Sequence, residues 1–588
     1  MATVLSTAVL SQDGYFTMMI VGEISIAYCS MNIPDEELVV IIQNAHLATA
    51  AELSELQSFA KTAGLNLADV LLQKSIVTDE HLGKLYAESL GIPFVNLSSV
   101  TISDEVYRIV PDKYAKTHKL IPFARDATGV TVAMSNPKDT ATIASLAKKT
   151  GQKIIVHFAT EKDIHNALQL HKRELSEVFE DLMRHYKNEG EAPVTNIVDL
   201  LLHSAVDDTA SDIHIEPQET DSLVRFRIDG ILHDMMHFSK SMHSQVVSRI
   251  KVMANLRTDE HSAPQDGKIR IKHDEQPVDI RISIIPMVEG EKIVMRLLVS
   301  HFRLFSFADL GMNEEAVAKI TAALHRSYGM ILSTGPTGSG KTTSIYAMLQ
   351  ILNRRDKNIT TIEDPVEYRI KGVNQIQVNA KSNLTFASGL RSILRQDPNI
   401  VFVGEIRDAE TAGIAINAAL TGHLVVSTLH TNDAATTLPR LSDMHIEPFL
   451  VASSVSLIVA QRLVRKICDY CRISVMITED ELKKNLPTAM INKHYIPVGE
   501  SREIRVYKGQ GCKNCRQTGY AGRIGIFEIL EVTKEIRKLI TARQDADIIA
   551  QKAIEEGMIT MLDDGLIKVS KGETTIEEIL RVTKVESL

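Results

Sequence analysis

A glycine-rich segment near the middle of the chain has the residue types and spacing of a phosphate-binding loop. Residues 335–342 read GPTGSGKT, which is a glycine, four residues and then Gly-Lys-Thr. Glycines let backbone N–H groups turn toward phosphate oxygens at a helix N-terminus, which favours anions. Lys341 can then reach the β- and γ-phosphates, and the Thr342 hydroxyl can ligate Mg²⁺. The predicted nucleotide-binding residues are Gly335, Pro336, Thr337, Gly338, Ser339, Gly340, Lys341, Thr342 and Thr343.

Acidic side chains follow two apolar runs farther along the chain. Glu363 and Asp364 come directly after residues 359–362, and Glu405 comes shortly after residues 400–403. Hydrolysis of a phosphate bond needs one acid to orient the water and another to support the metal. If both runs are parallel strands, their carboxyl ends meet the phosphate-binding loop at one edge of the sheet. The sequence therefore predicts that Glu363 and Glu405 belong to the same site.

Two histidines bracket a third apolar run. His423 precedes residues 424–428, and His430 follows shortly after them. A histidine at the end of a strand can sense a γ-phosphate by hydrogen bonding. Both are candidate site residues, and a structural role is the alternative for His423.

Four of the five cysteines form two close pairs, Cys468 with Cys471 and Cys512 with Cys515. Two such pairs brought together fit a tetrahedral four-thiolate zinc site. A closed site of this kind has no open position, so the predicted zinc is structural rather than catalytic. The alternative is that these are reduced cysteines paired by chance. So few cysteines exclude a disulfide scaffold.

The elements that must position these groups have the pattern of an α/β domain. Residues 330–334, 359–362, 400–403 and 424–428 are short apolar runs typical of buried strands. Helical segments such as residues 343–352 separate them. Because ligands bind at the carboxyl ends of the strands in an open parallel sheet, we predict a RecA-like fold.

The preceding segment, residues 211–300, is predicted to be rich in strands. In residues 223–228 apolar and basic residues alternate, which places Arg225 and Arg227 on one face. A half-buried sheet with a solvated basic face is the simplest interpretation. The same alternation recurs at Lys268, Arg270, Lys272, Asp279, Arg281 and Arg296.

The N-terminal third combines helices with a small α+β unit. An apolar stripe at helical spacing is formed by Leu53, Leu56, Phe59 and Ala60. The α+β unit has predicted strands at residues 120–123, 130–134 and 154–158. Residues 174–192 are charged and have the composition of a linker, with a helix as an option for its first part.

Composition limits the compartment and the partners. The chain has 588 residues, too many for one core, and a formal net charge of −9, which argues against broad nucleic-acid binding. It contains no uninterrupted apolar run of about 18 residues, the length that predicts a membrane span. No Lys or Arg occurs before Lys61, so the basic region of a signal peptide is missing. We therefore expect a cytoplasmic protein that reaches membranes only through partners.

Consecutive motifs resemble the ATPase family of type IV pilus assembly and type II secretion. Residues 361–368 (TIEDPVEY) resemble its aspartate box, 390–408 (LRSILRQDPNIVFVGEIRD) its atypical Walker B region, and 421–434 (TGHLVVSTLHTNDA) its histidine box. Upstream, SDIHIEP, FRIDG, PQDGK and VMRLL resemble the family's second N-terminal domain. The resemblance runs from about residue 194 to the C-terminus.

The resemblance implies a catalytic set. Glu363 would activate the water, and Glu405 would support the Mg²⁺ site. His430 would contact the γ-phosphate, with His423 as a further candidate. Asn399 replaces a frequent aspartate, a change that removes no catalytic group.

The resemblance also implies a homo-hexamer. In this family, arginines of the second N-terminal domain contact nucleotide across the moving subunit interface. Arg227, Arg249 and Arg281 are the candidates for that contact here, and Arg296 is a further one. Lys268 stands where arginine is common, and lysine lacks the bidentate fork of arginine.

The implied function is that of a Mg-dependent ATP hydrolase that powers pilin polymerisation in type IV pilus assembly. The implied partners are an inner-membrane platform protein and a cytoplasmic docking protein, with the chain located at the inner face of the membrane. The zinc-binding insertion is typical of assembly and secretion ATPases, and retraction ATPases generally lack it. Alternatives are a type II secretion or DNA-uptake pilus ATPase, a nucleic-acid translocase, and a nucleotide-gated scaffold without hydrolysis.

Residues 46–96 resemble one copy of the family's N-terminal helical domain. Residues 65–72 lack the arginine and glycine of relatives that bind cyclic di-GMP, so docking to a partner is expected rather than binding of that ligand. The predicted domains are a lead-in (1–34), a partner-docking region (35–175), a linker (176–193), a PAS-like α+β domain (194–303) and a RecA-like ATPase domain (304–588) with a zinc-binding insertion at about 462–525.

Overall fold

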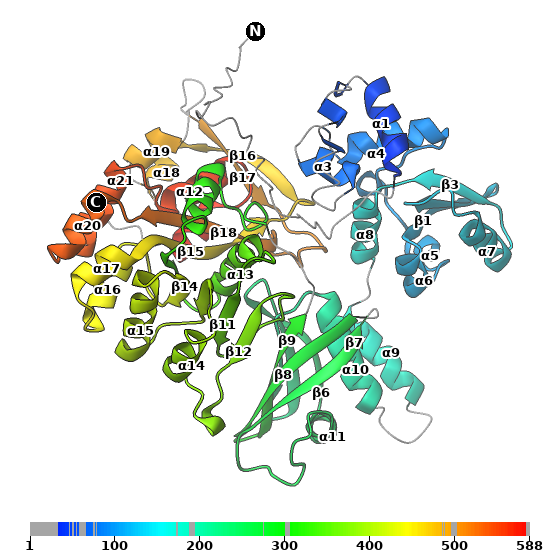
Figure 1. The fold of residues 1–588 in the computed structure, drawn as a ribbon. Helices are drawn as coiled ribbons and strands as arrows, with labels where there is room; N and C mark the ends of the chain where they lie inside the picture. The colour runs from blue at the N-terminus through cyan, green and yellow to red at the C-terminus, as the bar shows by residue number, and fades with distance from the viewer. Residues whose placement is uncertain are drawn as a thin grey trace. The chain divides into compact units, whose positions relative to one another are not determined.

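The computed structural model divides the chain into two compact units (Figure 1). The first comprises Met1–Val100 and Thr117–Ile164, and the second comprises Thr101–Lys116 and His165–Leu588. Phe59 and Ala60 of the predicted helical stripe lie outside the described residues, as does most of the predicted lead-in. The structure describes residues 33–45, 47–49, 52–54, 56–57, 66–73, 77, 79–171, 174–186, 194–273, 276–299, 306–484, 486, 488–494 and 503–583.

The first unit packs short helices beside a three-stranded sheet of order β1-β2-β3. The strands predicted at residues 120–123, 130–134 and 154–158 are present. Leu53 and Leu56 are buried in a cluster that also includes Phe158 of β3. Its elements are α1 (Asp35–Asn44), α3 (Leu67–Gln73), α4 (Asp79–Leu90), η1 (Leu97–Ser99), β1 (Leu120–Asp126), β2 (Gly129–Met134), α7 (Thr140–Thr150) and β3 (Ile154–Phe158), with α8 (Glu161–Leu170) at the boundary.

The second unit contains a six-stranded antiparallel sheet of order β6-β5-β4-β9-β8-β7. Alternate residues such as Val224, Ile280 and Met295 are buried against helices on one face. The opposite face carries the basic residues of the alternating pattern. The elements are β4 (Asp212–Pro217), β5 (Asp221–Ile228), β6 (Ile231–Ser239), β7 (Gln265–His273), β8 (Gln276–Met287) and β9 (Gly290–Val299), with α10 (Val194–Asp207) and α11 (Lys240–Met253).

The first part of the predicted linker is helical. Residues 175–186 form α9 (Leu175–Tyr186). Leu175, Phe179 and Leu182 pack against the core of the six-stranded sheet. The spacing of these apolar residues places them on one face of a helix, and burial of that face stabilises it in spite of the charged residues between them.

The second unit also contains a seven-stranded sheet of order β12-β11-β13-β14-β10-β15-β18. Every neighbouring pair is parallel except β15 with β18. The four strands predicted from apolar runs are all present in it. The strands are β10 (Gly329–Thr334), β11 (Ile359–Glu363), β12 (Asn374–Gln377), β13 (Ile400–Val403), β14 (Leu424–Leu429), β15 (Val455–Ile467) and β18 (Tyr520–Glu531).

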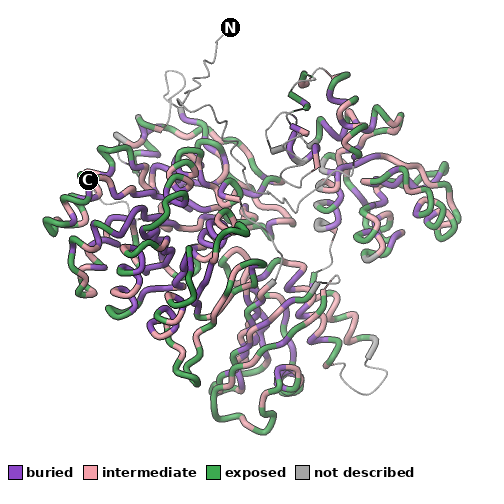
Figure 2. Tube along the Cα trace, viewed as in Figure 1, coloured by how far each residue is buried: buried purple, intermediate pink, exposed green. Residues whose placement is uncertain are grey.

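Helices cover both faces of this sheet, and its central strands β10, β11, β13 and β14 are buried (Figure 2). Side chains of α12 (Glu314–Leu324) and α13 (Lys341–Leu352) form one core with the sheet. Side chains of α14 (Phe386–Ile393), α15 (Ala409–Leu420) and α17 (Pro448–Ser454) form the other. The unit also contains α5 (Asp104–Tyr107), α6 (Asp112–Thr117), η2 (Ala380–Ser382), α16 (Thr437–Asp443), α20 (Lys534–Thr541), α21 (Ala546–Glu555), α22 (Met561–Ser570) and α23 (Ile576–Val582).

The insertion is shorter than the predicted residues 462–525. β15 and β18 pair in the main sheet as far as Ile467 with Tyr520, so only residues 468–519 leave the sheet. The described residues of this segment form a two-stranded antiparallel sheet with two helices. Its elements are β16 (Arg472–Thr478), α18 (Glu479–Lys483), α19 (Thr488–His494) and β17 (Glu503–Gly509).

Among the residues described, no helix has both the length and the apolar character needed to cross a bilayer.

Candidate functional site

The predicted phosphate-binding loop connects β10 to α13. Gly340 has a left-handed backbone (φ 88°) directly before the helix, a conformation that favours glycine. The Lys341 ammonium donates hydrogen bonds to the carbonyls of Gly335 (2.7 Å) and Pro336 (3.0 Å) and is buried. On β15, the side-chain amide of Gln461 donates to the Ser339 carbonyl (2.7 Å). The loop is therefore held closed around its own lysine, at a helix N-terminus that can receive an anion.

Two charged side chains, those of Glu405 and Arg462, lie close enough to Lys341 to affect its pKa. Burial lowers the pKa of Lys341 to about 8, Glu405 opposes that shift, and the Arg462 guanidinium adds to it. Arg462 lies on β15, two residues beyond Ala460, which pairs with the last residue of β10. It therefore extends beside the phosphate-binding loop. A basic group at this place was not predicted from the sequence, although QR at residues 461–462 inside an apolar strand was a visible signal.

Glu405 lies at the carboxyl end of β13 and is largely buried. One of its carboxylate oxygens contacts the Arg407 guanidinium at 2.5 Å, and the other lies 3.3 Å from Nε2 of His430. The structure thus brings Glu405 and His430 together, and Glu405 acts electrostatically on Lys341. This acid–histidine pair lies at the edge where the sequence predicted a metal and a γ-phosphate contact.

Glu363 ends β11, one strand beyond β13 in the sheet order. Its carboxylate is only 2% exposed and accepts hydrogen bonds from the Tyr346 hydroxyl (2.5 Å), the Thr361 hydroxyl (2.6 Å) and the Gln375 amide (3.2 Å). Burial raises the pKa of Glu363, and these three donors counteract the rise. A buried acid with a raised pKa, hydrogen-bonded to the helix that follows the phosphate-binding loop, suits a group that orients water.

His423 lies at the opposite edge of the sheet. It precedes β14, whose carboxyl end is at Leu429, and its Nδ1 lies 3.0 Å from the Ala418 carbonyl. Its own carbonyl accepts from the N–H of Gly329, the first residue of β10. The structure therefore does not bring His423 together with the phosphate-binding loop, which follows the other end of β10, and the catalytic role of His423 stays a prediction.

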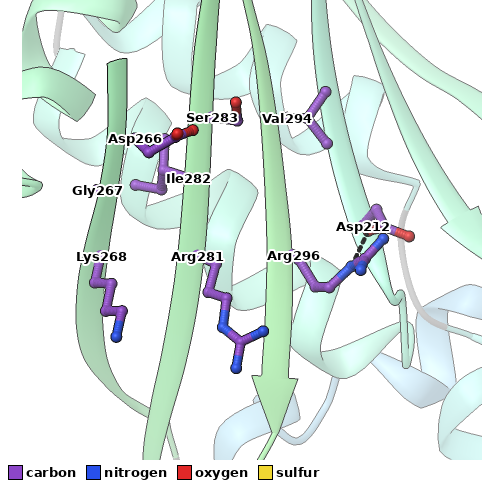
Figure 3. A pocket seen from close by; sticks show the side chains of 9 residues that line it. All are labelled: Asp212, Asp266, Gly267, Lys268, Arg281, Ile282, Ser283, Val294 and Arg296. Atoms are coloured by element: carbon purple, nitrogen blue, oxygen red, sulfur yellow. Dashed lines mark hydrogen bonds and ion pairs between the residues drawn. The ribbon is translucent and has the colours of Figure 1, made fainter. Parts of the chain in front are cut away.

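The open face of the six-stranded sheet gathers basic side chains from neighbouring strands. A pocket of about 440 Å³ on this face is lined by Lys268, Arg281 and Arg296, among other residues (Figure 3). Arg296 donates to Asp212 (2.9 Å), which Arg227 also approaches (3.5 Å).

The arginines predicted for the subunit interface divide between two faces. Arg227 and Arg281 lie on the open face, and Arg281 donates to the Val366 carbonyl (3.4 Å), three residues after Glu363. Arg249 belongs to α11, which packs on the other face of the sheet. The structure therefore does not bring Arg249 together with the other two.

The four predicted zinc ligands form one cluster. The Cys468 and Cys512 sulfurs lie 3.8 Å apart, as do those of Cys471 and Cys515, and all four lie within 4.8 Å of one another. Tetrahedral zinc with Zn–S bonds of about 2.3 Å separates its sulfurs by about 3.8 Å. Backbone N–H groups of Cys512 and Gly519 donate to the Cys515 sulfur (3.2 Å each), as suits a thiolate. The cluster fits a zinc ion.

Family models match two parts of the chain. Residues 187–581 match the family of type II/IV secretion system proteins, and residues 90–177 match the MshEN domain. The first match covers both the six-stranded and the seven-stranded sheets. It therefore includes the phosphate-binding loop, the strand-end acids and the cysteine cluster.

Curated relatives align over most of the chain. The type IV pilus assembly ATPase PilB of Myxococcus xanthus is 36% identical over 92% of this chain and 97% of its own length. The type II secretion system protein E of Dickeya dadantii is 39% identical over 85% of this chain and 96% of its own length. The type II secretion system protein HxcR of Pseudomonas aeruginosa is 46% identical over 67% of this chain and 78% of its own length. Among solved structures, the ATPase DotB of Legionella pneumophila has a TM-score of 0.48 at 20% identity, over 65% of this chain and 94% of that one.

Proposed function

This chain belongs to the type II/IV secretion system protein family, and we propose that it is the ATPase that powers pilin polymerisation in type IV pilus assembly. The reaction is hydrolysis of ATP to ADP and phosphate. The observation that carries this proposal is the convergence of Lys341, Glu405 and His430 at one edge of the sheet. A phosphate-binding loop alone indicates nucleotide binding, whereas an acid–histidine pair beside it supplies groups for hydrolysis.

The loop residues would bind the phosphates. In the free protein Lys341 donates to the Gly335 and Pro336 carbonyls, and ATP would offer phosphate oxygens as better acceptors. Thr342 and Glu405 would hold Mg²⁺, which when bound neutralises charge on the phosphates. His430 would contact the γ-phosphate, and its pairing with Glu405 would orient the imidazole.

Glu363 is the proposed group that orients the attacking water. Because Tyr346, Thr361 and Gln375 all donate to its carboxylate, the side chain is fixed in one orientation before substrate binds. That arrangement supports preorganisation of the water. Alignment of the water would then require release of one of these donors or use of a remaining lone pair.

The active assembly would be a homo-hexamer in which Arg227 and Arg281 contact the nucleotide of a neighbouring subunit. Their shared open face also carries Arg296 and Lys268, and Arg227 and Arg296 both pair with Asp212. Movement of the six-stranded domain against the ATPase domain during the cycle would transmit force. We propose that the N-terminal unit docks to a cytoplasmic partner, and that the ring acts on an inner-membrane platform protein from the cytoplasmic side. Cyclic di-GMP is not among the expected ligands.

The zinc would be structural. Four thiolates occupy every tetrahedral position, so no site remains for a substrate. Metal binding would hold the base of the insertion, residues 468–519, closed against the ends of β15 and β18.

Phosphate release by the purified full-length chain with Mg-ATP tests the assignment. The wild type is expected to hydrolyse ATP without DNA, and Lys341→Ala is expected to be inactive. Hydrolysis only in the presence of DNA would instead indicate a nucleic-acid translocase. No hydrolysis by the assembled hexamer would indicate a nucleotide-gated scaffold.

Type II secretion is the second candidate, because HxcR and the Dickeya dadantii protein E are as similar to this chain as PilB is. A DNA-uptake pilus is a third use of the same motor. A chromosomal deletion separates these functions. Loss of surface pili with normal export of secreted enzymes would support pilus assembly, and the reverse would support type II secretion.

A further inference from the structure

Glu528 is a buried carboxylate that the proposed reaction does not use. It lies on β18, the outermost strand beside β15, and is 7% exposed. One oxygen accepts the backbone N–H of Ala434 (2.9 Å), and the other accepts that of Met561 (3.4 Å), the first residue of α22. Burial raises the pKa of this carboxyl, and the two N–H donors counteract the rise.

Ala434 belongs to the turn that follows His430. At its start, the Thr431 N–H donates to the hydroxyl of Thr334, the last residue of β10 (3.0 Å). The Thr334 and Thr431 hydroxyls also contact each other. Because Thr334 directly precedes the phosphate-binding loop, this end of the turn is fastened to the nucleotide site.

Side chains of strands β15 and β18 form hydrogen bonds with the rest of the turn. Arg462 on β15 donates to the side-chain oxygen of Asn432 (3.0 Å). Glu528 pairs with Ala460 across the strands, so its side chain projects on the same face as that of Arg462. Arg462 and Glu528, which lie on adjacent strands, thus form hydrogen bonds with the turn. Arg462 bonds to Asn432, and Glu528 bonds to Ala434.

We propose that Glu528 is a positioning residue that fixes the turn after His430 and so places the imidazole at the γ-phosphate. The inference rests on the proposed role of His430. It also makes α22 a support of the nucleotide site, because the same carboxylate holds the start of that helix. A backbone N–H held by a carboxylate is a stronger constraint than one held by a neutral acceptor.

Asp564 offers a matched control in the same core. It is 2% exposed and lies on α22, where it accepts the N–H of Phe527 (2.9 Å) and pairs with Lys568 (2.5 Å). Phe527 precedes Glu528 directly. Asp564→Asn therefore disturbs the same strand and helix without removing the bond to Ala434.

The test compares affinities for a non-hydrolysable ATP analogue and for ADP in the full chain. Glu528→Gln is expected to weaken binding of the analogue on the order of tenfold and to leave ADP within about twofold, as loss of a γ-phosphate contact would. Asp564→Asn is expected to lower the melting temperature with little change in the ratio of the two affinities. In a His430→Ala background, Glu528→Gln should have no further effect on that ratio.

Three results would overturn the inference: an unchanged ratio in Glu528→Gln, an equal change in Asp564→Asn, or a full effect of Glu528→Gln in the His430→Ala background. Each is distinguishable from failure of the proposed function, because wild-type ATP hydrolysis is measured on the same preparation. A wild type that binds nucleotide without hydrolysing it would contradict the motor assignment. The ratio of the affinities for the ATP analogue and for ADP would still test the role of Glu528 in that case.

Discussion

The hydroxyl of Tyr346 donates a 2.5 Å hydrogen bond to the carboxylate of Glu363 and so joins the phosphate-loop helix α13 to strand β11. Both side chains are buried, with exposures of 0% and 2%. Movement of α13 on nucleotide binding would therefore displace the carboxylate of Glu363, the acid proposed to orient water.

Tyr346→Phe removes this donor and keeps the ring that packs in the core. The turnover number for ATP is expected to fall several-fold, because Glu363 loses part of its fixed orientation. The pKa of Glu363, already raised by burial, should rise further, so the acidic limb of the pH–rate profile should move to higher pH. Tyr328→Phe, at an exposed tyrosine, is the control. An unchanged profile in Tyr346→Phe would show that the bond does not tune the acid.

Lys341 should make ATP binding sensitive to pH. Burial lowers its pKa to about 8 from 10.5, so the unfolded chain binds more protons than the folded chain between these values. The free energy of unfolding of the nucleotide-free protein should therefore increase as the pH rises from about 8 to 10.5. ATP affinity should fall over the same range, because the phosphates require the ammonium form.

Titration of ATP binding between about pH 7 and 9.5 checks this expectation. Lys341→Arg keeps its charge throughout, so any binding it retains should depend less on pH. A wild-type affinity that stays constant to pH 9.5 would contradict the depressed lysine pKa.

The cysteine cluster is expected to bind one zinc ion per chain. Cys471→Ser should release the metal and lower the melting temperature by several degrees, since the site would contribute to folding of the insertion. Metal content and thermal unfolding of the full chain measure both effects. Cys29→Ser, which alters the one cysteine outside the cluster, should retain full zinc content. Equal zinc content in Cys471→Ser and the wild type would exclude the four-thiolate site.

The two faces of the six-stranded sheet should differ in their effect on hydrolysis. Arg281→Ala is expected to lower ATP turnover of the assembled ring at least about tenfold, because its guanidinium would act on a neighbour's nucleotide. Binding of nucleotide to the isolated chain should change little. Arg249→Ala, on the helical face, should affect stability more than turnover. The reverse pattern in the two variants would assign the interface to the other face.

Much of the site was predictable because local patterns define it. The glycine spacing of residues 335–342 fixed the phosphate-binding loop between a strand and a helix, and the structure has both elements. Spacing within the two cysteine pairs likewise indicated one four-thiolate cluster. In the loop, and within each cysteine pair, the chemistry constrains residues that are close in sequence.

Other features depended on contacts that no local pattern reveals. Tyr346 has the appearance of an ordinary core residue on α13, and only the packing of that helix on β11 brings its hydroxyl to Glu363. His423 illustrates a different point. A residue that precedes a parallel strand lies at the amino edge of the sheet, so chain direction alone could have separated it from His430.

The pairing of Ile467 with Tyr520 has a consequence for how this chain could diversify. Opposed residues in an antiparallel pair have Cα atoms only about 5 Å apart, so a turn of a few residues would bridge the gap that residues 468–519 now span. The two ends of the insertion therefore lie next to each other in the sheet. Deletion of the insertion would preserve the hydrogen-bond register of the motor sheet but uncover part of its core, because Leu482, Ile491 and Ile504 of the insertion are buried in that core.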